Sequence, residues 1–143
     1  MGFLSRILGS QPDHPPLASS DPAAGRLEAL KEPIEKLAKE LPDPLEIVPT
    51  DEAAYAFIGK PPKKFGIAWV DADGQVHNFK SLVEEQGLSV VTLEKLSDEL
   101  KNAYIRGEDE DRFVARVGER KVVVTPSETL ATDVRKIIRK YAS

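Results

Sequence analysis

Short apolar runs and amphipathic stretches alternate along the second half of the chain. A run over 63–70, nearly all apolar after its two lysines, is followed by an Asp-Ala-Asp-Gly turn at 71–74 and by a returning run over 75–79. Asp-Gly between two apolar runs is among the strongest local signals for a β-hairpin. Residues 112–124 repeat the pattern, with apolar and charged positions alternating around a turn at 118–120. The pattern therefore predicts two antiparallel hairpins.

Helical patterns follow the first hairpin. A short helix is expected over 80–86, with Gly87 at its end. The short apolar run over 88–91 predicts another strand. Thr92 is expected to cap a longer helix. The apolar face of that helix comprises Leu93, Leu96, Leu100, Ala103 and Tyr104.

The last helix has the clearest start signal in the chain. Residues 125–128 read Thr-Pro-Ser-Glu, which is a capping box with proline at the first helical position. Thr125 is therefore the expected N-cap. The buried stripe of this helix comprises Leu130, Val134, Ile137, Ile138 and Tyr141.

Residues 63–143 thus have the expected order strand, strand, helix, strand, strand, helix. Hairpins supply antiparallel pairs, and helices with one apolar stripe bury it against a sheet. We predict an α+β fold, a two-layer sandwich of antiparallel β-hairpins with about four or five strands and with helices on one face. A proline-rich helical segment is expected to precede this core.

Apolar residues recur at spacings of three and four in the preceding segment, after a helix start at Asp21-Pro22. They are Leu27, Leu30, Ile34, Leu37 and Leu41. Pro33 interrupts this stripe and either kinks one helix or begins a second. Two interpretations follow: the stripe lies on the chain's own core, or it is a dimerisation or partner-binding surface.

The rest of this segment is divided by prolines. Residues 45–48 alternate briefly and predict a short edge strand, where flanking prolines are tolerated. Thr50 is expected to cap a short, alanine-rich helix over 51–58. Gly59 and the two prolines at 61–62 would end that helix.

The first residues form a small amphipathic pattern. Phe3, Leu4, Ile7 and Leu8 would share one face of a helix. Residues 9–22 have the composition of an extended linker. The peptide is therefore a candidate for weak contact with a membrane or a protein partner. It lacks the features of a secretory signal, and Arg6 stands where a myristoylation motif needs serine or threonine.

Proline and charge divide the chain at the same place. Ten of the 11 prolines fall in residues 1–62, which carry 6 Lys+Arg and 10 Asp+Glu and therefore a net charge of −4. Residues 63–143 carry 14 of each. Three regions are predicted: a tail over 1–21, a helical segment over 22–62 that packs on the core, and the α+β core over 63–143.

Composition narrows the chemistry. The chain has no cysteine, which excludes disulfides, cysteine nucleophiles, thiolate zinc sites and cysteine-ligated iron–sulfur clusters. His77 is the one candidate general base in the core, with Asp71 or Asp73 to orient it across the hairpin. No nucleophile or phosphate-binding motif accompanies it. Neither a cofactor nor a metal is predicted.

Two groups of cations raise a nucleic-acid interpretation. Lys63 and Lys64 precede a strand that contains Trp69, and arginines decorate the second hairpin. Basic and aromatic residues on a sheet can bind single strands by stacking. The overall charge of −4 makes nucleic acid an unexpected partner.

We therefore predict a non-enzymatic, intracellular protein-binding or adaptor domain with an unidentified protein partner. It is expected in the cytoplasm, with a weak peripheral contact at the inner face of the membrane through the amino-terminal peptide. The candidate binding residues are Phe3, Leu4, Ile7, Leu8, Leu27, Leu30, Ile34, Leu37, Lys63, Lys64, Trp69 and His77. The alternative is a small-ligand protein or enzyme that uses His77 with Asp71 or Asp73. A third is nucleic-acid or nucleotide binding through Lys63, Lys64 and the arginine-rich second hairpin.

Overall fold

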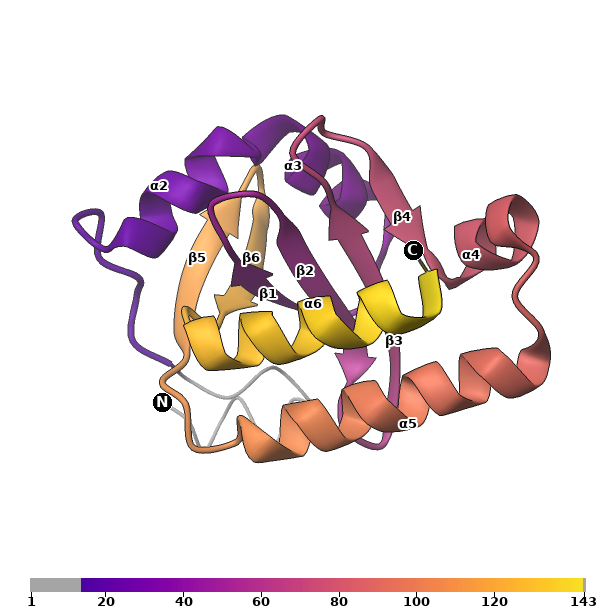
Figure 1. Ribbon diagram of the computed structural model, residues 1–143. Coiled ribbons are helices and arrows are strands. Elements are labelled where there is room, and N and C mark those ends of the chain that lie inside the picture. Colours follow the sequence, from indigo (N-terminus) through magenta and orange to yellow (C-terminus); the bar gives the residue numbers. More distant parts are fainter. Residues whose placement is uncertain (1–13, 143) are drawn as a thin grey trace.

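The structure, a computed structural model, describes residues 14–142 as one six-stranded sheet and five helices (Figure 1). The strands are β1 (Leu45–Pro49), β2 (Ala54–Lys60), β3 (Lys64–Val70), β4 (Val76–Asn78), β5 (Phe113–Val117) and β6 (Arg120–Val124). The helices are α2 (Pro22–Ala29), α3 (Lys31–Glu40), α4 (Phe79–Gln86), α5 (Val90–Arg106) and α6 (Glu128–Ala142). The predicted α+β class is confirmed.

The sheet is mixed, with strand order β4-β3-β2-β1-β6-β5. Strands β1 to β4 pair antiparallel in sequence order, and β5 and β6 form the second predicted hairpin. One parallel pair joins the two parts, with Glu46 and Ile47 of β1 opposite Val123 and Val124 of β6. The prediction of hairpins alone therefore missed the parallel contact at the centre of the sheet.

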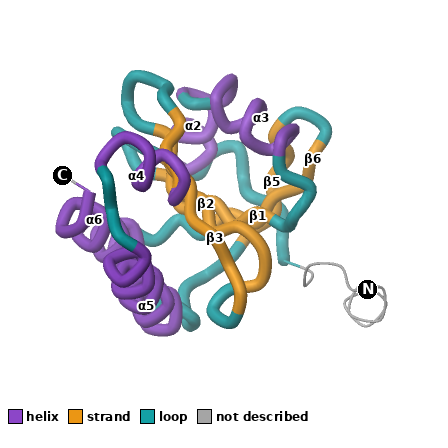
Figure 2. The backbone as a smooth tube through the Cα atoms, turned by 90° about the vertical axis from the view of Figure 1, so that its right-hand side faces the viewer, coloured by secondary structure: helices purple, strands orange, loops and turns teal. Residues whose placement is uncertain are grey.

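Helices cover both faces of this sheet (Figure 2). Helices α2 and α3 contribute to a cluster with the inward residues of one face, and α4, α5 and α6 contribute to a second cluster on the other face. The prediction of two layers with helices on one face is wrong. The cause is the proline-rich segment, which supplies both a helical layer and two central strands.

Strand β2 occupies most of the stretch that was expected to be a helix over 51–58. Its residues alternate between the faces, with Ala54 and Ala56 in one cluster and Tyr55 and Phe57 in the other. A strand that is buried on both faces loses the polar alternation that marks a half-exposed one. Thr50 does not cap a helix: its hydroxyl oxygen accepts from the Ala53 backbone N–H at 2.8 Å and closes the turn between β1 and β2.

Helix α5 also begins earlier than the sequence predicts. The expected strand over 88–91 is absent from the described structure, because Val90 and Val91 already lie in the first turn of α5. Ser89 is the N-cap, and its hydroxyl oxygen accepts from the Thr92 backbone N–H at 3.2 Å. The two β-branched valines favoured a strand locally, but the cap two residues before Val91 sets the boundary.

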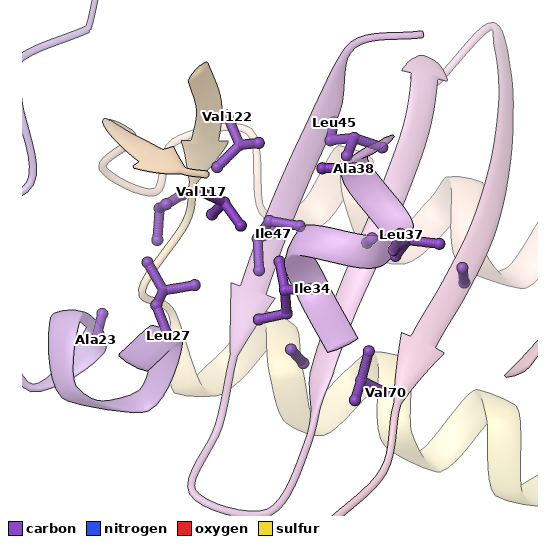
Figure 3. Packing of buried hydrophobic residues seen from close by; sticks show 14 residues of the cluster. Ala23, Leu27, Ile34, Leu37, Ala38, Leu45, Ile47, Val70, Val117 and Val122 are labelled. Carbon is purple, nitrogen blue, oxygen red and sulfur yellow. The ribbon is translucent and has the colours of Figure 1, made fainter. Parts of the chain in front are cut away.

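The apolar stripe over 27–41 lies on the chain's own sheet (Figure 3). It is divided between α2 and α3, which meet at Leu30, and Pro33 is the third residue of α3. Leu27, Ile34 and Leu37 are buried in the cluster, while Leu30 is partly buried against it. Ile34 and Leu37 are only 1% and 5% exposed, so they are not surfaces for a partner.

Candidate functional site

The β3–β4 hairpin brings together the residues of the predicted histidine site. His77 Nε2 lies 2.9 Å from Asp71 Oδ2, and the imidazole stacks on the Trp69 ring with centroids 5.4 Å apart. Asp71 Oδ1 accepts from the backbone N–H groups of Asp73 and Gln75 at 2.9 and 3.0 Å. Asp71 is therefore the orienting carboxylate, whereas Asp73 contributes its backbone.

The electrostatics of this hairpin explain the role of Asp71. The hydrogen bond from His77 lowers the pKa of the Asp71 carboxyl, and the backbone donors of Gln75 and Asp73 lower it further. All of these contacts lie within one turn and its flanking strands. None of Trp69, Asp71 and His77 lines any of the four best-formed pockets of the described residues. The contacts that the structure shows stabilise a turn, so we do not assign the arrangement a catalytic role.

The predicted basic patch is divided in the structure. Lys63 and Lys64 are exposed at the turn between β2 and β3. Two arginines of the second hairpin are committed to internal contacts instead. Arg120 donates to the backbone carbonyls of Ala38 and Leu41 at the end of α3, and to that of Asp43 at 2.8 Å.

Arg112 is the second internally paired arginine, and it belongs to a polar cluster around Glu46. The Glu46 carboxylate lies in β1 and is 8% exposed. Tyr104 and Thr125 donate hydroxyl protons to its two oxygens, each at 2.7 Å, and Arg112 Nε donates to Oε2 at 3.1 Å. Burial and the negative charge of Glu46 raise the pKa of Tyr104 far above its usual range.

The hydrogen bonds of the Glu46 cluster connect separate elements of the fold. Arg112 also donates to the carbonyls of Gly107, Glu108 and Glu110, which fixes the loop between α5 and β5. No buried side-chain nitrogen or oxygen in the described residues lacks a hydrogen-bond partner. Sequence reasoning missed this cluster, although one signal was visible: an acidic residue within an apolar run expected to be a strand.

A more open feature lies between α2 and the β5–β6 hairpin, and we call it the β5 groove. Its volume is about 560 Å³. It is lined by Pro16, Leu17, Ala24, Leu27, Glu28, Lys31, Val114, Ala115, Arg116, Val117, Gly118 and Lys121. Figure 3 shows Leu27 of α2 on the side toward Val117 of β5. The lining thus combines an apolar floor with charged side chains.

Strand β5 is an edge of the sheet, and the chain itself covers part of that edge. Val114 N–H donates to the Pro15 carbonyl at 2.9 Å, and Leu17 N–H donates to the Val114 carbonyl at 2.8 Å. This short parallel pairing ends where the chain turns at 18–21 to enter α2.

Arg116 is the next residue of β5 whose backbone faces outward. In an antiparallel pair, alternate residues turn their N–H and C=O groups away from the partner strand. Val114 faces away from β6, so Arg116, two residues on, does the same. No described residue forms a backbone hydrogen bond with Arg116 on this side. The β5 edge is therefore occupied at Val114 and open at Arg116.

A smaller pocket of about 230 Å³ lies where the parallel strands β1 and β6 end. Arg26 crosses it with Nε 2.8 Å from Asp51 and one guanidinium nitrogen 3.8 Å from Glu128. These ion pairs join α2 to the β1–β2 turn and to the start of α6. They give Arg26, Asp51 and Glu128 of the lining a role in holding these elements together.

Three further points concern metal binding, membrane crossing and the amino-terminal peptide. No group of three histidine or carboxylate side chains there is placed to hold a metal ion. None of the helices described is long and apolar enough to cross a bilayer. The amphipathic peptide of Phe3, Leu4, Ile7 and Leu8 lies outside the described range.

Comparisons with known proteins add no assignment to this geometry. No family profile matches the chain, and neither the curated proteins nor the solved structures contain a significant match.

Proposed function

We propose that this chain is a protein-binding domain and that the β5 groove is its binding surface. One observation carries the proposal: an apolar groove of about 560 Å³ adjoins a sheet edge whose backbone is open at Arg116. Edge strands with an adjacent groove are a recurrent means of capturing peptide segments. The predicted amino-terminal peptide and its linker over 9–22 stay part of this proposal, since Pro15 of that linker is hydrogen-bonded to β5.

The groove replaces the stripe over 27–41 as the candidate surface. Of that stripe only Leu27 reaches the groove, since Ile34 and Leu37 are buried against the sheet. The cations of the groove, Lys31, Arg116 and Lys121, are exposed and can be changed without disturbing the core. They give the proposal a direct experimental test.

The test compares charge reversal inside and outside the groove. The double variant Arg116→Glu with Lys121→Glu changes the groove, and Lys63→Glu with Lys64→Glu is the matched control at the β2–β3 turn. Both sets are exposed, so each variant should retain the thermal stability of the unchanged chain. Immobilised full-length chains are incubated with extract of the cells that express the protein, and the captured proteins are identified by mass spectrometry.

We expect at least one protein to be retained by the unchanged chain and the control but lost by the groove variant. Equal capture by all three chains would show that the β5 groove is not the binding surface. Nucleic acid in the captured fraction is measured by dye fluorescence. Its loss with the Lys63 and Lys64 variant alone, and no effect of the groove variant on captured proteins, would favour the nucleic-acid alternative instead.

A further inference from the structure

We infer that the β5 groove takes an extended, acidic segment of the partner protein, which adds to the sheet as a strand beside Arg116. The inference rests on the proposed function and names the class of partner. Three features of the groove carry it: an open backbone edge, a cationic rim and a short apolar floor.

The backbone edge already takes a strand from this chain. Pro15 to Leu17 pair in parallel with Val114, through the two backbone hydrogen bonds of 2.8 and 2.9 Å. Proline is tolerated in such a segment because a strand at an edge needs only alternate N–H groups. The pairing stops because the chain turns at 18–21, not because β5 ends. Arg116 therefore offers the next donor and acceptor to an incoming segment.

The charges around the groove favour an acidic segment. Its lining holds three cations and one anion, Lys31, Arg116 and Lys121 against Glu28, which gives a local charge of +2 although the chain carries −4. Among the described residues, none of these three cations forms an ion pair with a carboxylate. An acidic side chain of the incoming strand would neutralise this excess.

The same charges disfavour a second copy of this chain as the occupant. Antiparallel pairing of two β5 edges about their open residue would place Arg116 opposite Arg116, and like charges directly opposite one another are destabilising. The groove therefore discriminates against self-association and favours a partner of opposite charge.

The apolar floor sets the pattern of the segment. Leu17, Leu27 and Val117 supply it, and the volume of about 560 Å³ holds only a few side chains. Because side chains of a strand alternate in direction, an apolar residue could enter the groove while its neighbours face the cations. A segment in which apolar and acidic residues alternate meets both requirements.

The experiment uses three synthetic peptides of about eight residues, a usual strand length. In the first, valine or threonine alternates with aspartate or glutamate. The second replaces every acid with lysine. The third keeps the acidic sequence but carries methyl groups on alternate backbone nitrogens, which removes strand hydrogen bonding. Binding to the full-length chain is measured by fluorescence anisotropy, and its location by hydrogen exchange of individual backbone amides.

We expect the acidic peptide to bind and the lysine peptide to bind at least about tenfold more weakly. Methylation should weaken the acidic peptide similarly, and Arg116→Glu with Lys121→Glu should weaken it about tenfold. Lys63→Glu with Lys64→Glu should bind it unchanged. The Arg116 amide should exchange at least about tenfold more slowly in the complex.

Two results would overturn strand addition: no binding of the acidic peptide, or equal affinity for its methylated form. The second result does not depend on any protein variant folding. If either occurs while the groove variant still loses a captured cellular protein, the proposed function stands and only its partner class is wrong. If the groove variant captures the same proteins as the unchanged chain, the proposed function itself fails.

Discussion

The Asp71 carboxylate forms three hydrogen bonds at one turn. It accepts from the backbone N–H groups of Asp73 and Gln75, and it bonds to the His77 imidazole. Its partners lie two, four and six residues away, which is why sequence reasoning could place Asp71 and His77 together. Glu46 is the opposite case. Its hydrogen-bond partners lie 58, 66 and 79 residues further along the chain, so no local sequence pattern could predict them.

The Asp71 contacts predict an acid-dependent loss of stability. Because the hydrogen bond from His77 lowers the pKa of folded Asp71, the charged carboxylate stabilises the folded state at pH values above its unfolded pKa of about 3.9. This contribution is lost as pH falls through the lower, folded pKa. Urea unfolding should therefore show Asp71→Asn to be less stable than the unchanged chain at pH 5, with the difference shrinking toward pH 2.5.

Asp73→Asn is the matched control for this prediction, because Asp73 contributes its backbone rather than its carboxylate to the turn. It should show no comparable dependence on pH. A difference between the unchanged chain and Asp71→Asn that stays constant from pH 5 to pH 2.5 would contradict the assigned role of the carboxylate.

Elements with a turn or cap signal at their ends were predictable, and those whose burial came from distant segments were not. The hairpins β3–β4 and β5–β6 and helix α4 follow from local sequence, with Gly87 in the left-handed conformation at the end of α4. The sequence of strand β2 predicts a helix, because helices cover both faces of the strand and it carries little polar alternation. Its alanines Ala54 and Ala56 pack on one face, and Tyr55 and Phe57 pack on the other. Sequence alone could not separate such a strand from a buried helix.

Helix α6 begins two residues later than the capping-box sequence predicts. It begins at Glu128, and the Ser127 hydroxyl oxygen accepts from the Leu130 backbone N–H at 3.1 Å. Thr125, the expected N-cap, instead donates its hydroxyl proton to Glu46 at 2.7 Å. The Thr-Pro-Ser-Glu sequence contains two residues that could cap the helix, Thr125 and Ser127. The hydroxyl of Thr125 is bonded to the buried Glu46 carboxylate, so Ser127 acts at the helix start.

This division of roles predicts which substitutions are coupled. Thr125→Val should cost about 1–3 kcal/mol because it removes a donor from a buried carboxylate, and Ser127→Ala should cost about 1 kcal/mol as the loss of a cap. In double-mutant cycles by urea unfolding, Thr125→Val should couple to Glu46→Gln by more than about 0.5 kcal/mol. Its coupling to Ser127→Ala should be near zero. The reverse pattern would restore Thr125 as the helix cap.

At the scale of the whole fold, residues 14–142 form a sheet with a helical layer on each face. Its central strands come from the proline-rich part of the chain. Composition and charge divide the sequence near residue 62, yet β2 and β3 pair across that point over seven residue pairs. The parallel contact of β1 with β6 then joins the two ends of the fold. This pairing joins strands far apart in the sequence, so the local pattern of either part of the chain cannot predict it.

Because one sheet separates two cores, substitutions in the two cores should be energetically independent while unfolding stays cooperative. Ile34 belongs to the cluster beneath α2 and α3, and Ile67 belongs to the cluster beneath α4, α5 and α6. Each change to valine should cost about 0.5–1.5 kcal/mol, and the double variant should equal the sum within about 0.5 kcal/mol. Trp69 fluorescence and far-ultraviolet circular dichroism should give the same urea midpoint for every variant.

Separate midpoints for the two probes would mean that the two helical layers unfold independently. That result would divide the chain into two units despite the shared sheet. Coincident midpoints with strong non-additivity would mean instead that a change in one core is transmitted through the sheet to the other. Additive costs and one transition are the expected combination, since Ile34 and Ile67 share no cluster and the six strands are hydrogen-bonded without a break.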